Sequence, residues 1–184
     1  MVYPISKLWA YPVFGILIRK INGLENIPNN TPLIIVSNHE KLIDPLYLVY
    51  IIIKKIDKKV HFLSTGKWWF LGETICRKWA GCVPVFEING AYHEMKNILQ
   101  QGKIIGIFPE GRLDKKARKL KTGAVRLAIE TNAPILPVGI KSSYLPYSSE
   151  IYIGKPIYLK DNKNIKKQAL DLMKHVYKLR NNLV

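Results

Sequence analysis

The feature that most constrains the fold of this chain is a regular alternation of short apolar runs with longer segments of helical periodicity. The runs have the length and β-branched content of buried strands: Leu33–Ser37, Val60–Ser64, Cys82–Phe86, Lys103–Phe108 and Ile135–Ile140, with one or two more within Ile151–Leu159. Helical patterns separate them, over residues 44–55, 67–79, 91–101 and 122–131. Strands that alternate with helices predict an α/β fold with a central, mostly parallel sheet flanked by helices.

Both ends of the chain are predicted to form helices beside this core. Residues 5–20 offer a broad apolar surface that contains Trp9 and Tyr11 and has cations at both ends. Such an N-terminal amphipathic helix suits a membrane interface, and it equally suits a face packed on its own domain. Asn164–Leu183 has the apolar spacing of a closing helix. We therefore expect one domain over residues 1–184, with an N-terminal interface helix and linker (1–30), a core (33–159) and a C-terminal helix (162–184).

The charge balance indicates anionic partners. Lys and Arg number 29 against 13 Asp and Glu, for a formal net charge of +16, which suits nucleic acid, anionic lipid or a phosphorylated substrate. Hydrophobic residues make up 48% of the chain, so a disordered protein is excluded. The longest apolar runs, Leu8–Ile18 and Leu46–Ile53, are shorter than the ~18–20 residues that cross a bilayer, so no transmembrane helix is expected.

Two short motifs follow predicted strands. One is Asn38-His39-Glu40-Lys41-Leu42-Ile43-Asp44-Pro45, and the other is Phe108-Pro109-Glu110-Gly111-Arg112. Open parallel sheets bind ligands at the carboxyl ends of their strands, which is where both motifs fall. A spacing of five does not place two side chains on one helix face. We therefore expect His39 in a turn and Asp44 at the start of the next helix, either bent back onto His39 or simply capping that helix.

The residues of these motifs have a definite chemistry. A histidine whose second nitrogen is held by a carboxylate is a suitable general base, so His39 and Asp44 are a candidate dyad. In the second motif the proline and glycine permit a tight turn, and Arg112 can bind a phosphate through two hydrogen bonds. Glu110 could position Arg112 or contact a substrate hydroxyl. The remaining histidines at 61, 93 and 175 lack such a partner in the sequence and are expected to be structural or exposed.

The two motifs resemble the His-x4-Asp and Phe-Pro-Glu-Gly signatures of the glycerolipid acyltransferase family, and of its 1-acylglycerol-3-phosphate acyltransferases in particular. The similarity extends from about Leu33 to Leu159. It implies transfer of a fatty acyl group from an acyl thioester to the free hydroxyl of a lysophospholipid, most readily 1-acylglycerol-3-phosphate to give phosphatidic acid. By this resemblance His39 is the general base with Asp44 as its partner. The residues that it assigns to the acceptor's phosphate and glycerol are Lys67, Glu110, Gly111 and Arg112.

Shorter segments extend the resemblance, and one departs from it. Gly81–Val85 and Ala133–Val138 resemble the second and fourth family motifs, and Lys121–Ala124 matches the Lys-x-Gly-Ala that commonly follows the third. Glu87 stands where the second motif normally has an arginine, which leaves the acceptor's headgroup open. The basic tract 115–121 offers Lys119 and Lys121 as contacts for a donor or headgroup, or it is a solvated loop.

The resemblance also implies partners and a location. The co-substrate is an acyl thioester of coenzyme A or acyl carrier protein, with no metal and no further cofactor. We expect a peripheral or monotopic protein at the cytoplasmic face of a membrane. One alternative is an acyltransferase that acts on another lysolipid or on a lipid-like alcohol or amine. The other is a basic nucleic-acid-binding protein without catalysis, although the sequence has no helix-turn-helix, RNP or zinc-finger pattern, so no nucleic acid is expected.

Overall fold

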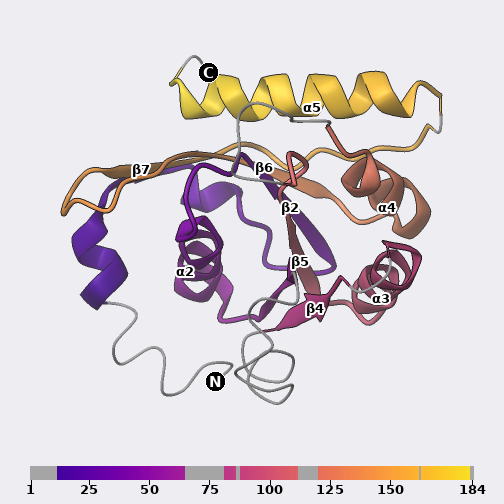
Figure 1. Cartoon of the computed structure of the whole chain (residues 1–184), viewed down its shortest axis with the longest axis horizontal. Coiled ribbons are helices and arrows are strands. Elements are labelled where there is room, and N and C mark those ends of the chain that lie inside the picture. Colours follow the sequence, from indigo (N-terminus) through magenta and orange to yellow (C-terminus); the bar gives the residue numbers. More distant parts are fainter. Residues whose placement is uncertain (1–11, 65–80, 86–87, 112–119, 162, 183–184) are drawn as a thin grey trace.

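A computed structural model describes residues 12–64, 81–85, 88–111, 120–161 and 163–182. In this part of the chain a seven-stranded sheet has the order β1-β7-β6-β2-β5-β3-β4 (Figure 1). Every neighbouring pair is parallel except β6 and β7. The predicted mostly parallel α/β sheet is therefore confirmed. The strands are β1 (Ile18–Asn22), β2 (Leu33–Ser37), β3 (Val60–Ser64), β4 (Cys82–Pro84), β5 (Ile104–Ile107), β6 (Ile135–Lys141) and β7 (Ser149–Ile153).

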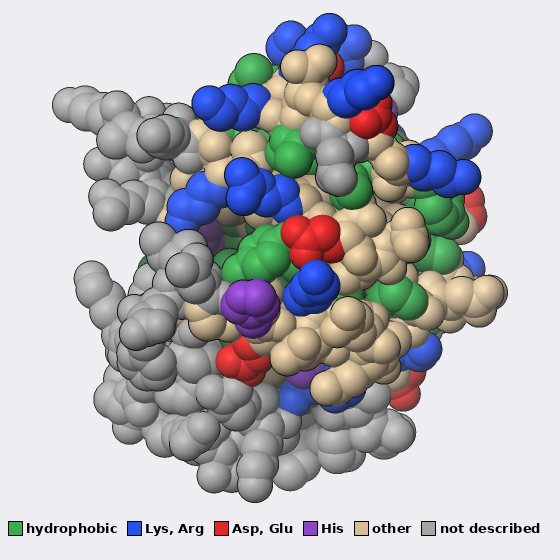
Figure 2. All heavy atoms as spheres, turned by 90° about the vertical axis from the view of Figure 1, so that its right-hand side faces the viewer, with side chains coloured by type: hydrophobic (Ala, Val, Ile, Leu, Met, Phe, Trp, Pro, Cys, Tyr) green, Lys and Arg blue, Asp and Glu red, His purple; other side chains and the backbone are tan. Residues whose placement is uncertain are grey.

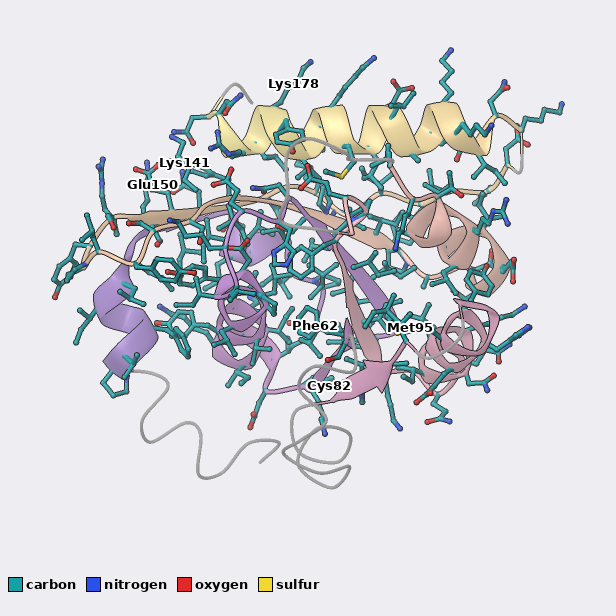
Figure 3. The ribbon with its side chains drawn as sticks, viewed as in Figure 1. Phe62, Cys82, Met95, Lys141, Glu150 and Lys178 are labelled. Atoms are coloured by element: carbon teal, nitrogen blue, oxygen red, sulfur yellow. The ribbon has the colours of Figure 1, made fainter. Side chains whose placement is uncertain are left out.

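Helices cover both faces of the sheet. They are α2 (Asp44–Ile56), α3 (Ile88–Gln100), α4 (Gly123–Thr131) and α5 (Ile165–Arg180), with a short 3₁₀ helix η1 (Leu24–Asn26). Side chains alternate along the fully buried β2, so that Ile34 packs with α3, α4 and α5 while Ile35 packs with α2. Met95 of α3 points inward to the sheet, whereas Lys178 of α5 points away from it (Figure 3).

The sheet order positions the two motifs. β2 lies between β5 and β6 and is parallel to both, with Val36 paired to Ile107. The chain that leaves β2 at Ser37 and the chain that leaves β5 at Ile107 therefore emerge side by side at one edge of the sheet. This is the physical reason why segments about seventy residues apart in sequence meet.

The N-terminal prediction was partly wrong. Residues 12–17 are helical, but the predicted helix over 5–20 ends there, and Ile18–Asn22 forms strand β1 parallel to β7. The sequence of this segment, IRKIN, has no period long enough to distinguish helix from strand. It forms a strand because the edge of β7 offers hydrogen-bond partners to its backbone. The remainder of that helix (1–11) and the helix predicted over 67–79 lie outside the described residues.

Candidate active site

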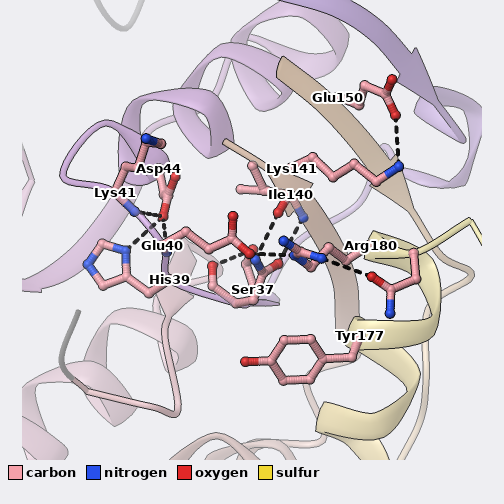
Figure 4. A network of polar contacts seen from close by, with 12 residues as sticks. Ser37, His39, Glu40, Lys41, Asp44, Ile140, Lys141, Glu150, Tyr177 and Arg180 are labelled. Atoms are coloured by element: carbon pink, nitrogen blue, oxygen red, sulfur yellow. Dashed lines mark hydrogen bonds and ion pairs between the residues drawn. The ribbon is translucent and has the colours of Figure 1, made fainter. Parts of the chain in front are cut away.

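His39 and Asp44 lie together, directly after β2. His39 Nδ1 is 3.0 Å from Asp44 Oδ2 (Figure 4). The same oxygen accepts hydrogen bonds from the backbone nitrogens of Glu40, at 2.6 Å, and Lys41, at 2.8 Å. Asp44 is fully buried and is the first residue of α2, whose N-cap is Ile43 and has no side-chain capping bond. The carboxylate thus faces the preceding turn, and the alternative that Asp44 simply caps its helix is wrong.

This contact indicates the tautomer of a neutral His39. A carboxylate only accepts hydrogen bonds, so in the neutral ring Nδ1 carries the hydrogen and the lone pair is on Nε2. The imidazole ring stacks on the Phe108 ring, with centroids 4.2 Å apart and planes 21° apart. Phe108 in turn lies 6.1 Å from the Phe62 ring of β3. The base is therefore held by the carboxylate at one edge and by an aromatic ring at one face, while its side chain stays 16% exposed.

Glu110 connects the second motif to the first. The residue is 7% exposed, and its Oε2 accepts a hydrogen bond from the backbone nitrogen of His39 at 3.0 Å. Oε1 accepts a hydrogen bond from the hydroxyl of Tyr177, on α5. The turn itself closes through Gly111 N to Phe108 O at 3.0 Å, and Gly111 has a φ of 68°, which glycine adopts without strain. The predicted contact of Glu110 with Arg112 stays a prediction, since residues 112–119 are outside the described part.

Lys121 is the cation that the described structure places at this turn. Its backbone nitrogen donates to Pro109 O at 2.9 Å, and a Cβ added to Gly111 would lie 2.9 Å from Lys121 Cε. The exposed ammonium end therefore lies beside the Glu110–Gly111 peptide. Of the other residues predicted for the site, Lys67, Arg112 and Lys119 lie outside the described residues.

Three site residues were missed in the sequence. Asn38 is fully buried and bonds the backbone of Ile140 on β6 in both directions at 2.8 Å, which ties the start of the turn to the sheet. The position of Asn38 directly before His39 is the sequence feature that could have identified it. Tyr177 contacts Glu110, and Arg180 forms an ion pair with Glu40. No local pattern could have found these two, because their partners are distant in the sequence.

Comparison with known proteins assigns the chain to a family. The family model described as Acyltransferase matches residues 18–141, which include both motifs and the strands β1 to β6. The chain belongs to the acyltransferase family. The resemblance inferred from the motifs is thereby confirmed.

Two relatives of this acyltransferase chain are both named 1-acyl-sn-glycerol-3-phosphate acyltransferases. It is 29% identical over 178 residues to the chloroplastic 1-acyl-sn-glycerol-3-phosphate acyltransferase LPAT1 of Arabidopsis thaliana, covering 84% of this chain and 48% of that protein. It is 25% identical over 158 residues to the 1-acyl-sn-glycerol-3-phosphate acyltransferase of Bacillus subtilis, covering 77% of this chain and 75% of that protein. The chain spans about half the length of several curated relatives that it matches.

A solved structure shares the fold of this acyltransferase chain. The 1-acyl-sn-glycerophosphate acyltransferase PlsC from Thermotoga maritima superposes with a TM-score of 0.69 at 20% identity, over 96% of this chain and 77% of the other. Within the described residues, no helix has both the length and the hydropathy needed to cross a membrane.

Proposed function

We propose that this protein transfers a fatty acyl group from an acyl thioester to the free hydroxyl of a lysophospholipid, with 1-acylglycerol-3-phosphate as the leading acceptor. The observation that carries the proposal is the pair of His39 Nδ1 and Asp44 Oδ2, 3.0 Å apart, in the turn after β2. The names of the relatives at 25% and 29% identity support this acceptor class.

The site residues suggest a direct transfer without an acyl-enzyme. His39 Nε2 takes the proton of the acceptor hydroxyl as its oxygen attacks the thioester carbonyl. The Asp44 carboxylate stabilises the imidazolium that forms. The new carbon–oxygen bond forms, the carbon–sulfur bond breaks, and the imidazolium proton passes to the departing thiolate. The products are the acylated lipid and free thiol, and His39 is again neutral.

The second motif would hold the acceptor's phosphate. Lys121 already lies against the Gly111 turn, and the family resemblance adds Lys67 and Arg112 as phosphate ligands. Lys119 would assist with the donor or the headgroup. A cation beside this turn favours an anionic headgroup, because it contributes a charge-assisted hydrogen bond to phosphate oxygens. Lysolipids with and without a phosphate monoester would measure this preference.

We propose that an exposed apolar surface near the His39 turn faces a membrane. Seven of the ten large exposed hydrophobic side chains in the described part of the chain belong to three segments, over residues 13–16, 42–46 and 144–147. The segments are adjacent: Tyr147 N donates to Ile16 O at 2.7 Å, and Lys41 Nζ lies 4.6 Å from the centre of the Tyr144 ring. Tyrosine, leucine and lysine together suit the lipid interface.

Vesicle binding tests this location. Leu145→Ser, in an exposed part of this surface, should weaken sedimentation with anionic vesicles, whereas Leu170→Ser, at an exposed leucine of α5 outside the three segments, should not. Equal binding by the two variants would contradict the placement. Figure 2 shows Lys and Arg side chains scattered over another face rather than gathered in one stripe, which does not favour a nucleic-acid-binding role there.

The decisive experiment measures acyl transfer by purified protein. A labelled acyl thioester and 1-acylglycerol-3-phosphate in vesicles should give phosphatidic acid, and His39→Ala should lower turnover by about 10²–10⁴-fold. His93→Ala, which removes an exposed histidine of α3, is the matched control and should leave turnover unchanged. Absence of product with every lysolipid and donor would overturn the activity. Unchanged turnover in a folded His39→Ala protein would remove His39 from its role.

A further inference from the structure

The last turn of α5 reaches the turn that carries His39 (Figure 4). The hydroxyl of Tyr177 donates to Glu110 Oε1, and Glu110 Oε2 accepts from the backbone nitrogen of His39 at 3.0 Å. Three residues further along, Arg180 Nε pairs with the carboxylate of Glu40, the residue that follows His39. Positions three apart lie on the same face of a helix. One face of α5 therefore contacts two carboxylates, one that accepts from the His39 backbone and one on the residue that follows His39.

Backbone contacts determine where α5 lies. A Cβ added to Gly139 of β6 would lie 2.3 Å from Arg180 N and 2.8 Å from Val176 O, so the helix packs directly on the strand. The next residue, Ile140, holds Asn38 through two hydrogen bonds of 2.8 Å. The helix and the start of the turn thus contact neighbouring residues of β6, Gly139 and Ile140. Tyr177 and Arg180 consequently project toward the turn from a helix that is packed directly on β6.

We infer that α5 positions the His39 turn for catalysis, Tyr177 through Glu110 and Arg180 through Glu40. This inference rests on the proposed function, in which His39 is the base. Tyr177 and Arg180 are positioning residues, since they act through other side chains. The family match ends at residue 141, so α5 lies beyond it. The placement of a general base matters because a shift of about 1 Å can cost about 10²-fold in rate.

Tyr177→Phe is the direct test, because it removes the hydroxyl and keeps the ring. We expect kcat to fall about 10-fold with an unchanged KM for the acceptor, since in this inference the hydroxyl acts on the placement of the base and not on the acceptor. Tyr158→Phe, at an exposed tyrosine, is the matched control and should leave both constants unchanged. Arg180→Gln tests the second contact in the same way, with the exposed Lys178→Gln as its control on the same helix. A change in KM alone would overturn the inference.

The backbone amide of His39 provides a readout that does not depend on acyl transfer. A hydrogen bond to a carboxylate moves an amide proton downfield and slows its exchange. In Tyr177→Phe we expect this signal to move upfield and to exchange faster, while the melting temperature stays near that of the wild type. An unchanged signal together with an unchanged kcat would overturn the inference.

The two proposals can fail separately. If the wild-type protein transfers no acyl group, the proposed function fails, and the His39 amide still decides whether α5 positions the turn: a shifted signal in Tyr177→Phe supports it and an unmoved one overturns it. If Tyr177→Phe does not fold, Arg180→Gln is measured by the same signal, with the same two outcomes. If the amide moves but kcat does not, positioning by α5 is not catalytic and the inference is overturned.

Discussion

Replacing Asp44 by asparagine tests what the negative charge of the Asp44 carboxylate contributes beside His39. Asp44 Oδ2 accepts from His39 Nδ1 and from the backbone nitrogens of Glu40 and Lys41. An asparagine must place either its oxygen or its NH₂ group at this point. Two backbone N–H groups in fixed positions require an acceptor there, so the oxygen takes the place of Oδ2. Nδ1 of His39 then keeps its hydrogen and Nε2 remains the base.

The expected rate loss follows from this geometry. The tautomer is preserved, so the substitution removes only the charge that stabilises the imidazolium. A hydrogen bond to a charged group contributes about 1.5–3 kcal/mol, and each 1.36 kcal/mol is a factor of ten, so kcat should fall about 10- to 100-fold. The new NH₂ group would occupy the position of Oδ1, which is buried and has no hydrogen-bond partner in the described part of the chain. Burying this donor should also lower the free energy of unfolding by about 1–3 kcal/mol.

Initial rates of acyl transfer and denaturant unfolding measure the two effects together. Asp171→Asn, at an exposed aspartate of α5, is the control and should change neither. An unchanged kcat in folded Asp44→Asn would refute the role of Asp44. A loss of about 10⁴-fold, typical of a reversed histidine tautomer, would refute the argument that the two backbone donors orient the amide.

Two further predictions concern the surroundings of the site. Burial, with the charge of Lys59, lowers the pKa of His61 from 6.5 to about 4. The unfolded chain therefore binds this proton below pH 6.5, so stability should fall as the pH drops from 6.5 to 4. Solvent screening of the partly exposed ring keeps the loss below the ~3 kcal/mol that the shift alone implies, and His61→Gln should remove the slope in unfolding curves. A Cβ at Gly106 would lie 2.1 Å from the Phe62 ring, so Gly106→Ala should cost about 1–3 kcal/mol in urea unfolding. Gly90→Ala, in a helix with open space around it, should instead raise stability, and equal effects of the two would refute the packing argument.

Residues that are close together in the sequence were sufficient to predict much of the sheet and the centre of the site. The strands over 33–37 and 60–64 have the predicted bounds, because short runs rich in apolar residues between turn residues have few alternatives. The approach of Asp44 to His39 was also predicted, as one of two possibilities, because a five-residue spacing across a strand–helix turn permits it. These features depend on residues that are near in sequence.

Tertiary structure alone decided the rest. β1 is a strand because the edge of β7 pairs with it, although its sequence, IRKIN, was predicted as the end of a helix. Arg180 and Glu40 are 140 residues apart, and Tyr177 and Glu110 are 67 apart. Such contacts exist only after α5 packs on the sheet, and no local propensity encodes them. The sequence by itself determined most of the strands, the motifs and the candidate base, whereas the packing of distant elements determined β1 and the side chains that hold that base in place.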